Sequence, residues 1–139
     1  MATLLAHIKI RPGQEARFER VAAEMYRRSH ADEPGLRRYE YWRGEDPGTY
    51  YTLESFDEYL GFMNHQTSAH HEEAGPAFGE MIESMRLEWL DPLTTASPLV
   101  ATEPQELPEG SSERLQQYDE RHRIVIPPWW RDMREVEGS

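Results

Sequence analysis

The chain has 139 residues, a formal net charge of −11 and no cysteine. This length suits one domain with a buried core and room for an appendage. The lack of cysteine excludes disulfides and thiolate metal sites, and the acidic balance argues against nucleic acid, which needs a basic surface. No signal-like N-terminus and no run of 18 apolar residues is present, so we expect a cytoplasmic protein without a membrane span.

The first half of the chain begins with a predicted strand over residues 3–10. A helix is expected from about 14 to 32, because Phe18, Val21, Ala22 and Met25 share one helical face. Pro34 should end that helix, since the residue before proline disfavours α geometry.

Two further strands are expected over residues 36–43 and 49–54, joined by a turn rich in glycine, aspartate and proline. A second helical region follows over residues 56–82. Ser55 and Glu58 have the spacing of a capping box at its start, and Pro76 predicts a break near residue 75, after which a short last helix begins.

A fourth strand is expected over residues 84–90, where apolar and polar residues alternate. The resulting βαββαβ order predicts an α+β, ferredoxin-like domain over residues 1–91 with a four-stranded antiparallel sheet. Helices on one face leave the other face bare. Because the first two strands carry large side chains on both faces, we expect a second copy to cover that face in a homodimer.

Residues 92–139 form a separate C-terminal extension in this interpretation. Prolines punctuate its first part, which predicts a linker, and residues 111–121 could form a short helix. Residues 124–130 read Ile-Val-Ile-Pro-Pro-Trp-Trp. Such side chains offset the entropy of ordering when they are buried, so we expect this arm to dock on the domain or on the dimer partner.

The stretch from Ser55 to His71 carries the most specific pattern. An aromatic residue, Phe56, ends a strand, and His65-Gln-Thr-Ser68-Ala-His70 follows nine residues later. With the βαββαβ order, this pattern resembles the antibiotic biosynthesis monooxygenase family of dimeric α+β barrels. The resemblance covers residues 1–91. It departs from the family at Phe56, where tryptophan is usual and an indole N–H is therefore lost.

The resemblance implies a monooxygenase that needs no metal, flavin or other cofactor. Such oxidoreductases act with dioxygen on electron-rich aromatic substrates, among them polyketide-like anthrones and quinols of antibiotic biosynthesis. The protein then has to supply an aromatic cavity, a base and a donor for the developing anion.

The candidate residues follow from these needs. The expected catalytic residues are His65, His70, Asn64 and Arg86, and the expected substrate-binding residues are Trp42, Tyr51, Phe56, Phe62, His71 and Trp89. The residue pattern also allows plainer roles: His65 lies opposite the apolar stripe of an ideal helix, His71 is expected in solvent, and Arg86 has the position of a cross-strand ion pair.

A metal site is not expected, because the adjacent His70 and His71 diverge by about 100° on a helix. A haem-degrading branch of the fold depends on an asparagine, a tryptophan and a histidine whose places are taken here by Ala6, His65 and about Gly75, which argues against haem degradation. Two alternatives stay open: a non-oxidative isomerase or cyclase on the same barrel, and a barrel protein that binds a small ligand without turnover.

Overall fold

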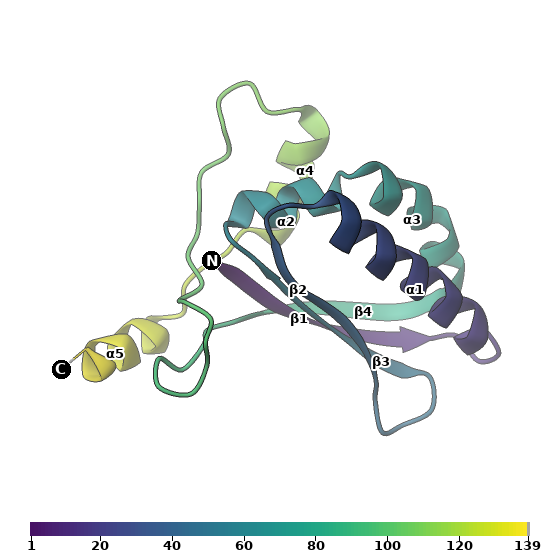
Figure 1. Cartoon of the computed structure of the whole chain (residues 1–139), viewed down its shortest axis with the longest axis horizontal. Coiled ribbons are helices and arrows are strands. Elements are labelled where there is room, and N and C mark those ends of the chain that lie inside the picture. Colours follow the sequence, from purple (N-terminus) through teal and green to yellow (C-terminus); the bar gives the residue numbers. More distant parts are fainter. Residues whose placement is uncertain (139) are drawn as a thin grey trace.

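A computed structural model describes residues 1–138 of the chain. Four strands and three helices build the ferredoxin-like unit, and two more helices follow it (Figure 1). The elements are β1 (Ala2–Ile10), α1 (Glu15–Asp32), β2 (Leu36–Arg43), β3 (Thr49–Phe56), α2 (Tyr59–Gln66), α3 (Ala69–Met81), β4 (Ile82–Leu90), α4 (Glu113–His122) and α5 (Pro128–Glu137).

The sheet is antiparallel with the strand order β2-β3-β1-β4, and α1, α2 and α3 lie on one of its faces (Figure 1). On the central strand β1, Leu4, Ala6, Ile8 and Ile10 alternate toward the helices and are all buried. The expected α+β class and βαββαβ order are therefore confirmed. Three strands extend beyond their predicted bounds by one or two residues at one end.

Helix α1 buries Phe18, Ala22, Met25 and Ser29 at intervals of three and four residues. It ends at Asp32, as expected from Pro34, and the backbone N–H of Glu33 still donates to the Ser29 carbonyl. The chain turns there into β2, which leaves the Glu33 side chain at the end of α1 facing α2 and α3.

The second helical region differs from the prediction. It breaks between α2 and α3 at Thr67 and Ser68, whereas Pro76 lies inside α3. The hydroxyl groups of Thr67 and Ser68 donate to the carbonyl oxygens of Met63 and His65, and Ser68 Oγ accepts from the His71 N–H. These side chains satisfy the backbone at both helix ends, which is the physical reason for the break.

The predicted capping box is wrong. Ser55 belongs to β3, and its hydroxyl lies 2.8 Å from Thr3 Oγ1. Glu58 itself occupies the position before α2 and its side chain makes no cap bond, whereas Gln105 Oε1 of the C-terminal extension accepts from the Leu60 N–H at 2.9 Å. Ser55 therefore belongs to the sheet, although its spacing to Glu58 predicted a helix cap.

The C-terminal extension packs on its own domain. Tyr118, Ile124, Ile126 and Trp130 are buried in the same core cluster as residues of β1, β3 and α2. Trp89 Nε1 donates to the His122 carbonyl oxygen at 3.0 Å. A division of the chain at residue 91 stays a prediction. Within residues 1–138, no helix combines the length and apolar character required to cross a bilayer.

Candidate active site

A cavity of about 550 Å³ lies between the sheet and the helices. This volume falls within the range of small-molecule sites. Its lining residues come from all four strands and from α1, α2, α3 and α4, with polar groups beside aromatic ones: Tyr39, Tyr41, Thr52, Glu54, Phe62, His65, His71, Tyr118, Arg121 and His122.

Glu54 places a carboxylate on the core face of β3. It alternates in phase with Tyr50, Thr52 and Phe56, and only 6% of Glu54 is exposed. Burial raises the pKa of the Glu54 carboxyl to about 7, the charge of Glu33 acts in the same direction, and His65 opposes both. Near neutral pH this group can therefore accept a proton or release one.

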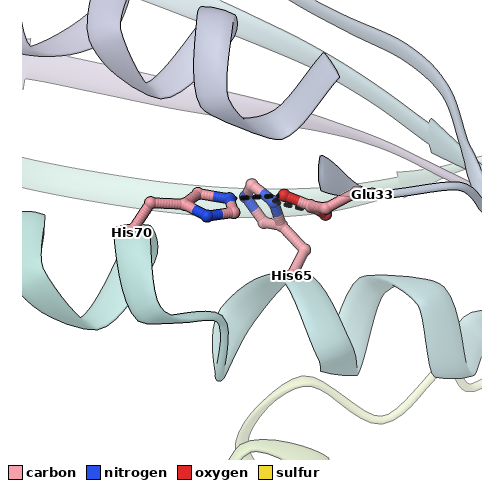
Figure 2. Close-up of side chains that lie close together, drawn as sticks. All are labelled: Glu33, His65 and His70. Carbon is pink, nitrogen blue, oxygen red and sulfur yellow. Dashed lines mark hydrogen bonds and ion pairs between the residues drawn. The ribbon is translucent and has the colours of Figure 1, made fainter. Parts of the chain in front are cut away.

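His65 lies between two carboxylates (Figure 2 shows its contact with Glu33). Its Nδ1 is 2.9 Å from Glu33 Oε2 and its Nε2 is 3.4 Å from Glu54 Oε1, although the side chain is only 2% exposed. Burial favours the neutral ring, but the hydrogen bond to Glu33 and the charges of both carboxylates outweigh it and raise the pKa of His65. The two carboxylates thus favour the protonated form of this buried ring.

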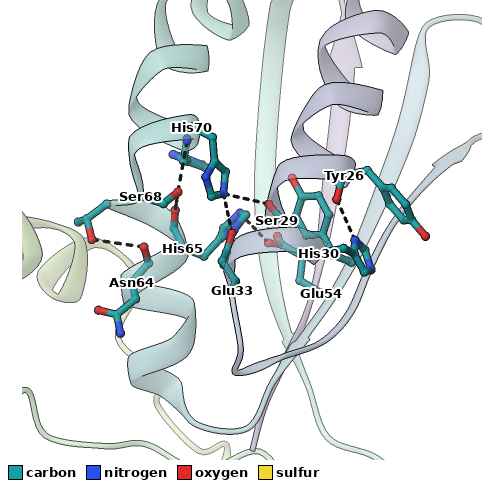
Figure 3. A network of polar contacts seen from close by, with 12 residues as sticks. Tyr26, Ser29, His30, Glu33, Glu54, Asn64, His65, Ser68 and His70 are labelled. Carbon is teal, nitrogen blue, oxygen red and sulfur yellow. Dashed lines mark hydrogen bonds and ion pairs between the residues drawn. The ribbon is translucent and has the colours of Figure 1, made fainter.

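Glu33 connects His65 to His70 (Figure 3). His70 Nε2 lies 2.6 Å from Glu33 Oε2 and 3.2 Å from Ser29 Oγ. Burial opposes ionisation of Glu33, but its contacts with both histidines prevail and lower its pKa. Glu33 and His70 also line an outer groove, so the chain Glu54–His65–Glu33–His70 leads from the cavity to that groove.

The ligand atoms of Glu33, His65 and His70 all lie within 4.8 Å of one another, a set that a metal ion could use. Glu33 lies 32 and 37 residues before His65 and His70 in the chain, so the helical spacing of the histidines does not reveal it. Both histidines approach the same oxygen, at 2.9 and 2.6 Å. Ligands at about 2.0–2.1 Å around a tetrahedral zinc ion are roughly 3.3 Å apart, so these contacts have the lengths of hydrogen bonds.

Two further groups give the cavity polar character. His71 lines it rather than extending into solvent, which corrects the expectation, and burial, with the charge of His65, lowers its pKa to about 3. Thr52 Oγ1 is buried and has no hydrogen-bond partner among the described residues. An unpaired buried hydroxyl is costly, so this atom is a natural partner for a polar group of a ligand.

Besides His70, which lines the outer groove, four of the expected site residues lie away from the cavity. Asn64 is exposed at the outer groove. Arg86 and Tyr51 lie on the opposite face of the sheet with His7, where Arg86 contacts His7 at 3.0 Å and Glu88 at 3.6 Å. The ion pair of Arg86 with Glu88 runs along β4 and its contact across strands is the one with His7, so the expected cross-strand ion pair is not observed within the described residues. Trp42 is 57% exposed in a separate groove beside α1.

The remaining expected aromatic residues lie in or behind the cavity wall. Phe62 lines it directly, whereas Phe56 and Trp89 pack against Phe62 at ring distances of 5.9 and 5.1 Å. Phe56 also contacts the His65 ring at 5.6 Å. His65 is buried between the sheet, where it contacts Tyr39 and Phe56, and the groups at the end of α1 and on α3, where it contacts Glu33 and His70.

Sequence reasoning missed Glu33, Glu54, Thr52 and Arg121. For Glu54 a signal was present, since it is in phase with Tyr50 and Phe56 on a strand whose other face carries Tyr51 and Leu53. For Glu33 and Arg121 no local pattern exists, because their positions depend on how α1 and α4 pack.

The family comparison agrees with this architecture. The model of the family described as antibiotic biosynthesis monooxygenase matches residues 1–77. Among curated proteins, none matches the chain.

Several solved structures share the fold. A Caulobacter crescentus protein, provisionally named an antibiotic biosynthesis monooxygenase, is 26% identical, has a TM-score of 0.63 and aligns over 66% of this chain and 89% of its own. A Pseudomonas aeruginosa protein is 21% identical with a TM-score of 0.62 over 67% of this chain and 94% of its own. A Mycobacterium tuberculosis protein is 22% identical with a TM-score of 0.62 over 69% and 98%.

The family match spans more than half of the residues and includes β1 to β3, α2 and most of α3, the elements that supply Glu33, Glu54, His65 and His70. The similar structures repeat the same strand and helix arrangement around that region. The chain belongs to the antibiotic biosynthesis monooxygenase family.

Proposed function

We propose that the protein is a cofactor-independent monooxygenase that oxidises an anthrone-like or quinol-like aromatic substrate with dioxygen. The observation that carries this proposal is the buried Glu54 carboxyl group, which lines an aromatic cavity 3.4 Å from His65 Nε2. The family membership gives the reaction class, and the name of the Caulobacter relative agrees with it.

Glu54 is the base in this proposal. Its pKa of about 7 lets it be ionised in part of the molecules at neutral pH and still hold a proton well. It removes the acidic proton from the substrate carbon or hydroxyl group, and the substrate anion forms in the cavity. His65, which stays protonated between Glu33 and Glu54, stabilises that negative charge.

The substrate anion is itself the reductant. It gives one electron to dioxygen, and the two radicals combine to form a carbon–oxygen bond, which yields a peroxide. Loss of water from this peroxide breaks the oxygen–oxygen bond and leaves the quinone. One atom of dioxygen enters the product, and the other leaves as water with the two hydrogens of the substrate.

Thr52 and His71 supply directional contacts. The unpaired Thr52 hydroxyl can donate to a substrate oxygen, and the neutral His71 ring can donate or accept. The residues with catalytic roles are thus Glu54 and His65. His70 has a supporting role through Glu33, and Asn64 and Arg86 have none.

The proposal includes a homodimer. Members of the family are commonly dimeric. The sheet face away from the helices carries exposed Trp42 and Tyr51 with half-buried Leu5 and Leu53, an apolar surface suited to a second copy. Light scattering at micromolar concentration tests this: a mass near 33 kDa, twice the 16.3 kDa of one chain, is expected.

The test of the reaction is oxygen uptake with isotope analysis. Purified protein, dialysed against EDTA, is given anthrones and naphthohydroquinones under ¹⁸O₂. We expect uptake of one dioxygen per substrate and one ¹⁸O atom in the quinone product, with the Glu54→Gln variant at background. A product with two labelled atoms, or turnover that EDTA abolishes, contradicts the proposal.

The non-oxidative alternative also has a specific basis, because a carboxyl with a pKa near 7 can move a proton within a substrate without dioxygen. Conversion of a substrate under anaerobic conditions, without change of mass, would favour an isomerase or cyclase. A ligand-binding protein without turnover needs no acid or base in its cavity, whereas this cavity contains Glu54, His65 and His71.

A further inference from the structure

The C-terminal extension contributes to the cavity described above. Tyr118, Arg121 and His122 of α4 are among its lining residues. Helix α4 lies well beyond residue 77, where the family match ends. The Pseudomonas aeruginosa structure aligns over 94% of its own length but only 67% of this chain, so about a third of this chain has no counterpart in it.

Contacts on three sides fix α4 over the cavity. Tyr59 Oη donates to Asp119 Oδ1 at 2.9 Å, which joins α4 to α2. Tyr118 Oη lies 3.1 Å from Glu72 Oε1 of α3, and the Trp89 indole of β4 donates to the carbonyl oxygen of His122. Helix α4 is therefore held in a defined position as one wall of the site.

Arg121 is the charged group that α4 adds. Its guanidinium lies 5.6 Å from the centre of the Tyr118 ring, and no carboxylate among residues 1–138 forms an ion pair with it. On the same helix, Arg114 and Arg123 are both paired, with Glu72 and Asp119. Arg121 is exposed, as are Arg11, Arg20 and Arg131, which also form no ion pair within residues 1–138, but among these four arginines it is the one that lines the cavity.

The charge of Arg121 affects His122, a residue of the cavity wall. Burial lowers the pKa of His122, and Arg121 lowers it further. The neutral His122 ring stacks on Tyr118 at an interplanar angle of 19° and contacts Phe62 edge-on. The wall below Arg121 is thus aromatic and uncharged, which suits a flat ring system with one charged substituent.

We propose that Arg121 recognises an anionic substituent on the substrate, so that the substrate class is an aromatic hydroxy compound bearing a carboxylate. The inference rests on the proposed function, since it names the substrate class of the same site. The hydroxyl end of such a molecule meets Glu54, His65 and the unpaired Thr52 hydroxyl, and the carboxylate end meets Arg121. Guanidinium groups suit this role because they bind carboxylates in a bidentate manner.

Binding of two probes tests the inference separately from catalysis. The probes are 1-hydroxy-2-naphthoate, which is anionic, and 1-naphthol, which is neutral and has the same ring system. Dissociation constants are measured under nitrogen from quenching of tryptophan fluorescence, so that no turnover is needed. Wild-type protein should bind the naphthoate at least tenfold more tightly than the naphthol, and this preference should weaken in high salt.

Three substitutions test whether Arg121 causes the preference for the naphthoate over the naphthol. Arg121→Gln should weaken naphthoate binding about tenfold and leave naphthol binding within twofold, and Arg121→Lys should keep part of the preference. Arg131→Gln is the matched control, because Arg131 is exposed on α5 and its loss changes the net charge equally. Circular dichroism shows whether each variant is folded.

The inference is overturned if wild-type protein binds both probes equally or neither, or if Arg121→Gln weakens both alike. Failure of oxygen uptake with a retained, Arg121-dependent preference for the naphthoate would refute the oxygenase proposal and leave the anion site standing. Oxygen uptake from neutral anthrones with no effect of Arg121→Gln on naphthoate binding would refute the anion site and leave the oxygenase proposal standing.

Discussion

The Glu54→Gln substitution tests the buried carboxyl directly, because it should change how stability depends on pH. Burial raises the pKa of Glu54 from 4.5 to about 7 in the folded protein. The native state therefore holds this proton more tightly than the unfolded chain does. The stability contributed by the protonated carboxyl is fully present below about pH 4.5 and is lost as the pH rises through 7.

The size of the effect follows from the shift. At about 1.4 kcal/mol per pKa unit, ionisation of Glu54 destabilises the native state by roughly 3 kcal/mol at high pH. About 2 kcal/mol of this lies between pH 5.5 and pH 8 by the same linkage. Glutamine resembles the protonated acid in shape and cannot ionise, so the variant should lack this pH-dependent loss.

The assay is urea unfolding of wild-type and variant protein at pH 5.5 and pH 8. We expect the free energy of unfolding to fall between the two pH values by about 2 kcal/mol more in the wild type than in the variant. Glu83→Gln is the control, because Glu83 is exposed on β4 and its substitution removes the same charge. Parallel pH profiles of wild-type and Glu54→Gln protein would refute the buried-carboxyl argument.

The other predictions concern the reaction and the extension. The value of kcat/KM should rise with pH through about 7 as Glu54 ionises. The Glu54→Gln variant should lack this rise because glutamine cannot ionise, and its rate in stopped assays should be at least about 100-fold lower. Arg86→Gln should leave oxygen uptake within twofold of wild type, since Arg86 lies on the opposite sheet face; a large loss would place the site elsewhere. Glu33→Gln should cost about 1–3 kcal/mol in urea unfolding, because His65 and His70 lose a charged acceptor; an unchanged midpoint contradicts the network. Trp130→Ala should cost about 3 kcal/mol, since Trp130 is 8% exposed in the core; a loss under 1 kcal/mol means that the arm does not dock.

Local sequence patterns predicted most of the fold. The alternation on β1, the helical spacing of Phe18, Ala22 and Met25, and the proline after α1 each act over a few residues, so their physical effect can be read without the tertiary structure. The same reasoning failed at Ser55, where pairing with Thr3 on the neighbouring strand takes precedence over helix capping. It also failed at Pro76, because the competing hydroxyl groups of Thr67 and Ser68 ended the helix earlier.

The site was only partly predictable for the same reason. In the sequence His65 and His70 are five residues apart, but their roles depend on Glu33, which lies at the end of α1 and contacts both rings. Burial of Glu54, which raises its pKa, requires α2 and α3 to cover the sheet. Arg121 reaches the cavity only because α4 packs on α2, more than fifty residues away in the chain. Charge, hydrogen bonding and burial at these residues arise from contacts distant in sequence, so only the tertiary structure could decide them.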